Sequence, residues 1–501
     1  MAGIKALAKE TAIYGLSSII GRFLNWCLVP LYVYLFPTYE YGIVSYLYSF
    51  TAVALVILNY GMETGFFRFA NKHESPGTVY TTALLSVGTT SLAFIALLTA
   101  FIGPVSTAMK LPGHASYVWM LGFIVALDAF SNIPFAYLRY KKRAVRFAVL
   151  KFVNIGLNIA FNLFFLLLCP ILARHCPAAI DWFYAPLGGE AFGIGWIFVA
   201  NLISTVLILI LLLPELTGRR YRFDGPLLRK MLRYSWPLLI LGVAGIMSQN
   251  MGQMIIPYLF SDQEAARSMV GIYGANIKIA ILMVMFTQAF RYAFEPFIFA
   301  QAGGKNGPNS RQAYCDAMKF FVILGLFIFL AVMLYLPLLK YFVSRSYWGG
   351  LDVVPIMMAA ELCFGVAFNL SLWYKLTDRT QWGMYLSVGC FIVMLALNLI
   401  FVPAIGIPRG YMGCAWAALI SYFLMMMASY FLGQYYYPVD YDLKTMGFYL
   451  ALTAILWGVG EKLLAFPGHA WLMYLSRTVL LVLFLAVIVK REKLPLPGHK
   501  K

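Results

Sequence analysis

Fourteen apolar segments run through this 501-residue chain, and each is long enough to cross a lipid bilayer. A crossing helix needs roughly 20 mostly apolar residues to match about 30 Å of hydrocarbon. Fourteen such helices use most of the chain and leave no room for a soluble catalytic domain. The sequence therefore predicts an all-α integral membrane protein. The predicted spans are residues 11–35, 42–67, 80–106, 115–138, 147–168, 191–213, 234–259, 271–299, 317–341, 353–374, 382–402, 410–433, 446–464 and 470–489.

Positive charge is concentrated on one side of this predicted topology. The net charge is +18, and most of the 38 Lys and Arg residues fall in alternate loops and in the C-terminal tail. Because Lys and Arg are enriched in cytoplasmic loops, both termini are expected in the cytoplasm. The charge then reports topology and contact with anionic lipids, and it argues against nucleic-acid binding. Two inner loops are especially basic, with Arg139, Lys141, Lys142, Arg143 and Arg146 in one, and Arg219, Arg220, Arg222, Arg229, Lys230 and Arg233 in the other.

A weak internal repeat divides the chain at the longest inner connection, residues 214–233. The first span ends in Pro30-Leu31-Tyr32, and the span after this connection ends in Pro257-Tyr258-Leu259. Gly42 and Gly271 then open the next span of each half. Six helices per half, with both halves starting inside, predict a parallel repeat about an axis along the membrane normal. The predicted domains are six-helix lobes at residues 1–215 and 226–437, followed by two additional helices at 445–491.

Four cationic side chains of the predicted spans are candidates for substrate binding, because a charge within a membrane is expensive unless it faces a cavity or a partner. They are Arg22, Lys151, Lys278 and Arg291. Arg22 lies near the middle of the first span, too deep for snorkelling to the interface. It is expected either to pair with Asp128 or Glu361, or to face an anionic substrate in a central cavity. Lys278 has no carboxylate one turn away, which favours a substrate-binding role.

Amide side chains form two further groups of candidate substrate-binding residues. Asn154, Asn158 and Asn162 follow Lys151 at helical spacing, so they share one face of the fifth span. This polar stripe predicts either interhelical hydrogen bonds or the wall of a wet cavity. The second group, in the seventh span, is Gln249, Asn250 and Gln253. These amides are expected either to bind sugar hydroxyls or to join neighbouring helices.

Carboxylates within the spans are candidates for coupling to H⁺ or Na⁺, because a buried carboxylate can take up a proton or bind a cation. The four candidates are Glu63, Asp128, Glu295 and Glu361. Glu295 lies four residues after Arg291, so these two side chains can also form a structural pair on one helical face.

No metal site, cofactor site or catalytic residue is indicated by the His and Cys residues. The five His lie in loops or in the tail, and most of the seven Cys lie in or beside spans, where packing is their expected role. Cys169 and Cys176 flank an outer loop, and a disulfide between them is the one open question.

Three short motifs resemble the multidrug/oligosaccharidyl-lipid/polysaccharide (MOP) exporter superfamily, on the polysaccharide transporter branch of Wzx-type flippases. The chain has an amphipathic entry at residues 5–15 into a span ending Val29-Pro30-Leu31-Tyr32. The stretch at residues 36–42 is similar to the family's Pro-x-x-x-Tyr-Gly turn, and residues 291–297 resemble its aromatic motif ending in Pro. The six-plus-six-plus-two layout extends this resemblance over nearly the whole chain and implies a MATE-like fold.

The resemblance implies a bacterial inner-membrane flippase and no enzyme. Its substrate would be an undecaprenyl-pyrophosphate-linked oligosaccharide for O-antigen, capsule or exopolysaccharide, moved between leaflets by alternating access. The implied partners are the lipid-linked glycan, anionic lipids and polysaccharide polymerase machinery. Two alternatives stay open, an ion-coupled multidrug or organic-cation antiporter of the same fold and a membrane glycan polymerase or ligase. A drug-cation site favours carboxylates and aromatic faces, whereas the first span carries Arg22.

Overall fold

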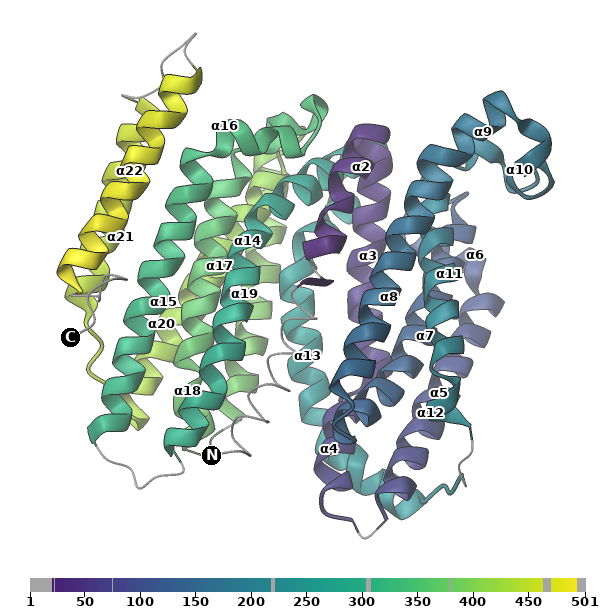
Figure 1. Cartoon of the computed structure of the whole chain (residues 1–501), viewed down its shortest axis with the longest axis horizontal. Helices are drawn as coiled ribbons and strands as arrows, with labels where there is room; N and C mark the ends of the chain where they lie inside the picture. Colours follow the sequence, from purple (N-terminus) through teal and green to yellow (C-terminus); the bar gives the residue numbers. More distant parts are fainter. Residues whose placement is uncertain are drawn as a thin grey trace. The chain divides into compact units, whose positions relative to one another are not determined.

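The computed structural model describes residues 20–21, 23–73, 75–217, 221–302, 308–377, 379, 381–462 and 470–492, and these residues form helices joined by short connections (Figure 1). In the first part of the chain the helices are α2 (Leu28–Leu35), α3 (Thr38–Asn59), α4 (Met62–Ala70), α5 (Pro76–Ala100), α6 (Ile102–Ala108), α7 (Ala115–Tyr140), α8 (Ala144–Leu163), the π-helical turn η1 (Phe164–Leu168), α9 (Cys169–His175), α10 (Pro177–Tyr184), η2 (Gly189–Phe192), α11 (Gly195–Leu211), α12 (Leu213–Leu216) and α13 (Gly225–Leu259). They continue with α14 (Gln263–Ala302), α15 (Pro308–Leu334), α16 (Leu336–Leu339), η3 (Lys340–Phe342), η4 (Arg345–Gly350), α17 (Val353–Leu370), α18 (Leu372–Leu376), α19 (Gln381–Ile405), α20 (Tyr411–Tyr436), α21 (Leu443–Lys462) and α22 (Ala470–Arg491).

The helices confirm the predicted fold class. Within the described residues, 12 helices are long and apolar enough to cross a membrane. Two shorter apolar helices, Phe23–Leu35 and Gly195–Leu211, coincide with the first and sixth predicted spans. Every predicted span therefore contains an apolar helix, and the chain is a multi-pass membrane protein.

Several predicted spans are bent or interrupted. The second is divided into α3 and α4 at Tyr60 and Gly61, whose φ angles of 31° and 69° lie in the left-handed region. Gly61 tolerates this conformation because it lacks a β-carbon. The fifth span passes from α8 into the π-helical turn η1, a type of distortion that is frequent at functional sites.

Contacts divide the chain into two compact units. The first unit comprises Met1–Gly274 with Ser387–Cys414, and the second comprises Ala275–Leu386 with Ala415–Lys501. The boundaries fall inside α14, α19 and α20. The units are defined by contacts between residues, so they do not test the predicted repeat. The lobes at residues 1–215 and 226–437 and the additional pair at 445–491 stay a prediction.

Each unit has its own apolar core. In the first unit, α3, α4, α5, α7 and α13 bury a cluster that includes Met62, Phe66 and Met231, all with 0% exposure. In the second unit, α21 and α22 pack against α15 around Leu330 and Phe484. Burial of such side chains contributes about 1.5–3 kcal/mol each, so both cores hold their helices in a fixed register.

The ends of the C-terminal helix pair are also held by charged side chains. Glu492 accepts hydrogen bonds from Lys319 Nζ at 2.8 Å and from the Tyr449 hydroxyl at 3.2 Å. At the other end of α22, Arg477 is 2% exposed and donates to the carbonyl oxygen of Leu334 at 2.7 Å and of Gly460 at 3.2 Å. Arg477 thus satisfies carbonyl groups where α15 and α21 end.

Candidate functional site

A row of polar side chains on α8 faces α2 within the first unit. Asn162 Nδ2 donates to the backbone oxygen of Asn158 at 2.8 Å and to its Oδ1 at 3.0 Å. Asn162 Oδ1 accepts a hydrogen bond of 2.9 Å from the hydroxyl of Tyr32. At the more exposed end of the row, Asn158 Nδ2 lies 3.5 Å from Oδ1 of Asn25. Asn162 therefore joins α8 to α2, as the first interpretation of the stripe expects, whereas Asn158 is half-buried and Asn25 is exposed. The wall of a wet cavity stays a prediction.

The repeat of asparagine at every fourth residue explains this arrangement. An α-helix places residues i and i+4 on one face, so Asn154, Asn158 and Asn162 rise along the same side of α8. Asn162 is 0% exposed and Asn154 and Asn158 are half-buried. Exposure thus increases from Asn162, whose amide is hydrogen-bonded at both its nitrogen and its oxygen, toward Asn158 and Asn154.

A half-buried carboxylate lies near the start of this row. Asp128 of α7 has the Lys151 ammonium of α8 and the Thr205 side chain of α11 as its neighbours. Tyr48 of α3 lies within electrostatic range of Asp128, and its hydroxyl accepts a hydrogen bond of 3.1 Å from Asn201 Nδ2 of α11. Helices α3, α7, α8 and α11, together with α2 and the residues just before it, contribute polar groups to this part of the first unit. We call these residues the polar cluster, namely Asn25, Tyr32, Tyr48, Asp128, Lys151, Asn158, Asn162, Asn201 and Thr205.

Lys151 is partly neutralised by its surroundings. Its Nζ lies 4.1 Å from the centroid of the Phe135 ring and near Asp128. A cation over a ring face is stabilised by about 0.5–2 kcal/mol. The Lys151 ammonium group therefore already interacts with Phe135 and Asp128. An anionic ligand would have to compete with Asp128 for it.

Glu63 takes part in a different arrangement. Its carboxylate forms an ion pair with Arg139 of α7, and these side chains are 38% and 31% exposed. Arg139 also lies 5.2 Å from the Phe67 ring centroid. A half-exposed ion pair of this kind fits a structural role better than a coupling role, although Glu63 stays a candidate.

The second unit carries other candidates. Lys278 is half-buried on α14, two residues after Asn276, which is 0% exposed and donates to the Tyr347 carbonyl oxygen at 2.9 Å. Arg291 is exposed and lies 4.5 Å from the Phe368 ring centroid. Glu361 of α17 is half-buried and has no described cation within 4.0 Å.

Two candidates cannot be placed. Arg22 lies outside the described residues, and so does the side chain of Glu295. The proposed pairing of Arg22 with Asp128 or Glu361 and the pairing of Arg291 with Glu295 therefore stay predictions.

The amides of α13 are divided between different environments. Gln249 is exposed, whereas Gln253 is 7% exposed. Asn250 Nδ2 donates to the Ile246 carbonyl oxygen of its own helix at 2.9 Å. Together these contacts favour neither sugar binding nor helix joining for the whole group.

Sequence reasoning missed Tyr48, Asn201 and Thr205 as members of the polar cluster. Asn201 and Thr205 are four residues apart in an otherwise apolar span, so the same periodicity that revealed the α8 row could have found them. Tyr48 carried no such signal, because it lies in a helix rich in other tyrosines.

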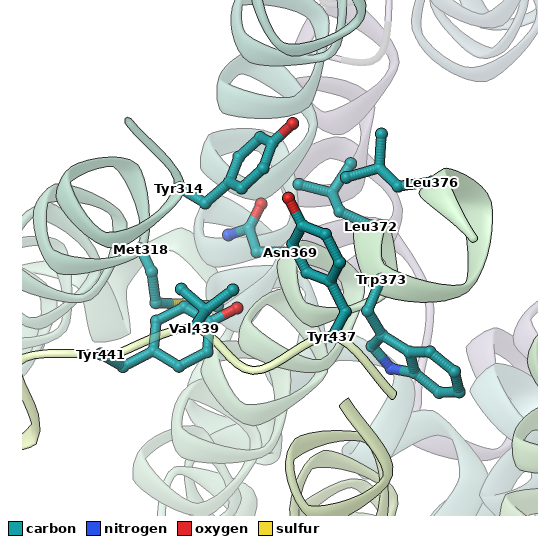
Figure 2. Close-up of a pocket in the computed structure, with 9 residues that line it drawn as sticks. All are labelled: Tyr314, Met318, Asn369, Leu372, Trp373, Leu376, Tyr437, Val439 and Tyr441. Carbon is teal, nitrogen blue, oxygen red and sulfur yellow. The ribbon is translucent and has the colours of Figure 1, made fainter. Parts of the chain in front are cut away.

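A pocket lies in the second unit, lined by Tyr314, Met318, Asn369, Leu372, Trp373, Leu376, Tyr437, Val439 and Tyr441 (Figure 2). Its empty space is about 330 Å³, including the part open to solvent. The Asn369 side chain lies between the rings of Tyr314 and Tyr437, and its Nδ2 has no hydrogen-bond partner among the described residues. The pocket offers one amide donor within aromatic walls and shares no residue with the polar cluster.

The structure has no disulfide between Cys169 and Cys176. Cys169 is a buried free thiol and Cys176 an exposed one. They stand at opposite ends of α9, which Cys169 begins and Cys176 follows directly.

Solved structures share this fold. An inward-facing multidrug resistance MATE family transporter of the MOP superfamily matches with a TM-score of 0.65 and 15% identity, over 83% of this chain and 94% of its own. Lipid II flippase MurJ, in an inward closed conformation, matches with a TM-score of 0.65 and 13% identity, over 97% of this chain and 99% of its own. The MATE multidrug transporter DinF-BH matches with a TM-score of 0.61 and 16% identity, over 85% of this chain and 95% of its own.

A search of curated protein sequences found no match. Residues 7–293, more than half of the chain, match the sequence family described as polysaccharide biosynthesis protein. The matched region includes the first seven predicted spans, most of the eighth and the whole polar cluster. The chain therefore belongs to the polysaccharide biosynthesis protein family.

Proposed function

We propose that the protein is a flippase that moves an undecaprenyl-pyrophosphate-linked oligosaccharide from the cytoplasmic to the periplasmic leaflet of a bacterial inner membrane. Both termini would lie in the cytoplasm. Transport would follow an alternating-access cycle in which the predicted lobes rock about the membrane midplane. The protein would act without catalysis, and its product would pass to the polysaccharide polymerase machinery.

The family match, taken with the extent of the MurJ match, is the observation that supports this proposal most strongly. The MurJ match leaves only about 15 of the 501 residues uncovered. Helices α21 and α22 contain 20 and 22 residues, so this match must include most of the C-terminal pair. The MATE match leaves 17% of the chain uncovered, so it can omit α21 and α22 altogether. This chain thus resembles Lipid II flippase MurJ over more of its length than it resembles the MATE transporter.

The chemistry of the candidate residues also favours a polyanionic, hydroxyl-rich cargo. Arg22 and Lys278 are the cations we assign to the pyrophosphate, because guanidinium and ammonium groups bind phosphate oxygens. The accessible amides of Asn25 and Asn158 suit sugar hydroxyls, since an amide both donates and accepts. Lys151, Arg291, Asn154, Asn162 and the amides of α13 would support this surface.

Coupling to H⁺ or Na⁺ is part of the proposal. Asp128 is the first candidate, because Thr205, Tyr48 and Asn201 surround it with oxygen and amide groups. Glu361 is the second. The rival function, a multidrug antiporter, is favoured by the presence of Asp128 and the aromatic side chains, but Lys151 beside Asp128 would repel a cationic drug.

The proposal is tested in liposomes that contain the purified protein and a labelled lipid-linked oligosaccharide. Transfer between leaflets is measured as the fraction of label that an added impermeant enzyme can reach. We expect Arg22→Gln and Lys278→Gln, alone and combined, to abolish transfer while leaving expression and folding intact. Lys141→Gln and Lys142→Gln, which remove exposed cations in a loop, are the matched controls and should transport normally. Normal transfer by the Arg22 and Lys278 double variant would remove the site assignment.

A further inference from the structure

The backbones of α3 and α14 touch at two glycines of the first unit. A β-carbon placed on Gly42 would lie 1.9 Å from the carbonyl oxygen of Arg267, and one placed on Gly271 would lie 1.9 Å from the carbonyl oxygen of Thr38. Each glycine therefore meets the carbonyl four residues before the other glycine. No side chain larger than hydrogen fits at either position unless the helices separate.

Hydroxyl groups continue this contact on both sides of the glycine pair. Thr38 Oγ1 lies 2.6 Å from Ser268 Oγ, and a β-carbon on Gly274 would lie 2.5 Å from Ser45 Oγ. Glycines, short hydroxyl side chains and backbone carbonyls thus approach one another over two helical turns.

Neighbouring elements close around the same point. The fully buried Tyr46 of α3 donates from its hydroxyl to the Met109 carbonyl oxygen at 3.0 Å. Its hydroxyl also lies 3.2 Å from that of Tyr258, at the end of α13. Arg267 Nη2 donates to the Lys110 carbonyl oxygen at 2.7 Å. The loop after α6 is therefore joined to both α13 and α14 at this end of the helices.

The two glycines are equivalent positions of the internal repeat, since each opens the second span of its half. We propose that the Gly42–Gly271 contact is a seal that joins the two predicted lobes at the periplasmic end and parts once in each transport cycle. This inference rests on the proposed flippase function. It identifies α3 and α14 as the two helices that must separate before a cargo can leave.

The composition of the contact suits reversible opening. Separating two apolar helix faces would expose hydrocarbon to water, which is unfavourable in proportion to the area. Here the atoms nearest the glycine pair are hydroxyls and carbonyls, and water can replace the hydrogen bonds that such groups lose. Glycine allows the close approach that shuts the seal, and the polar groups lower the free energy needed to open it.

A reversible disulfide tests the seal directly. Thr38→Cys and Ser268→Cys are introduced together into a variant whose seven natural cysteines are replaced, and copper phenanthroline serves as the oxidant. We expect the disulfide to form, transfer of labelled lipid-linked oligosaccharide to fall at least tenfold, and a reducing agent to restore it. The matched control is Ser75→Cys with Thr78→Cys, whose hydroxyls are 3.1 Å apart beside a single helix; its oxidation should leave transfer unchanged.

The outcomes separate the seal from the proposed function. Transfer that continues after complete cross-linking would overturn the seal but leave the flippase proposal intact. Absence of transfer in the reduced cysteine pair and in the wild-type protein alike would contradict the flippase proposal itself. Failure of the disulfide to form in the folded protein would also overturn the seal.

A second pair of variants tests the seal through the rate at which the disulfide forms. In the background that carries Thr38→Cys and Ser268→Cys, Gly42→Ala or Gly271→Ala should slow disulfide formation at least tenfold, because a methyl group forces the helices apart. Gly245→Ala is the control, since nothing lies within 4 Å of a β-carbon at that position. Equal rates in the Gly42, Gly271 and Gly245 variants would contradict the seal.

Discussion

The hydroxyl of Tyr32 donates a hydrogen bond of 2.9 Å to Oδ1 of Asn162, which ties α2 to the buried end of the asparagine row on α8. Tyr32 closes the Pro-Leu-Tyr end of the first span, and Asn162 is the last of three asparagines spaced by four residues. The first span is thereby held against the face of α8 that carries the candidate substrate-binding amides.

Replacing Asn162 with Ala should destabilise the first unit. The variant leaves the Tyr32 hydroxyl without its acceptor, and an unsatisfied buried polar group costs about 1–3 kcal/mol. Thermal unfolding in detergent should show this loss, and Tyr32→Phe combined with Asn162→Leu should lose less than the sum of the single changes. Additive losses would mean that the two side chains are not coupled.

Replacing Asn158 with Leu should act on transport more than on stability. Asn158 is half-buried and its bond to Asn25 is 3.5 Å long, so little native hydrogen bonding is lost. We expect lipid-linked oligosaccharide transfer to fall about tenfold while the unfolding temperature changes little. A variant that unfolds early but still transports would indicate that Asn158 only joins helices.

Neutralising Asp128 should change the dependence of transport on the ion gradient, whereas neutralising Glu63 should not. Glu63 is 38% exposed and paired with Arg139, and such pairs are worth at most about 1 kcal/mol. Glu63→Gln should therefore transport with the wild-type dependence on the ion gradient, whereas Asp128→Asn should lose that dependence. The measurement is transfer in liposomes with an imposed H⁺ or Na⁺ gradient. Identical behaviour of the two variants would contradict the assignment of Asp128.

Arg477 should be needed to dock the C-terminal helix pair. Replacing it with Leu removes hydrogen bonds to the carbonyls of Leu334 and Gly460, and a bond from a charged donor contributes about 1.5–3 kcal/mol. Hydrogen exchange along α21 and α22 should rise in this variant. Arg491→Leu, which removes an exposed cation stacked on Phe448, is the control and should leave exchange unchanged.

Acid should weaken the start of α21. The Thr445 side chain and backbone N–H hydrogen-bond the Asp442 carboxylate and lower its pKa from the usual value of 3.8. Since the folded pKa is the lower one, the charged cap stabilises the helix above the unfolded pKa, and this contribution is lost as pH falls through the folded pKa. Thermal unfolding between pH 6 and 3 should show a smaller dependence on pH in Asp442→Asn than in the wild type. Equal dependence would contradict the role of this cap.

Hydropathy predicted the membrane helices, because each span buries apolar side chains whatever its neighbours are. Spacing of four residues likewise predicted the α8 row. Contacts between distant helices were not predictable in this way. Gly42 and Gly271 were recognised as equivalent, but their mutual contact depends on how α3 and α14 cross, which a single sequence does not encode locally.

The contacts of charged side chains were also not predictable from the sequence. Sequence reasoning missed Arg477, which the structure buries against the ends of two other helices. The partners of Lys151 were also invisible, since Asp128 and Phe135 lie on α7, about 16–23 residues away in sequence. Polar residues in spans could be identified as candidates, but only tertiary structure separates those that join helices from those that face a cavity.

Transport of two cargoes offered together tests the central claim most directly. Liposomes that contain the wild-type protein would receive a labelled undecaprenyl-pyrophosphate-linked oligosaccharide and a fluorescent drug cation, and movement of each would be recorded under the same ion gradient. We predict that the lipid-linked oligosaccharide crosses and that the drug cation does not move above the rate in protein-free liposomes. Movement of the drug cation with the lipid-linked oligosaccharide left in its original leaflet would contradict the account.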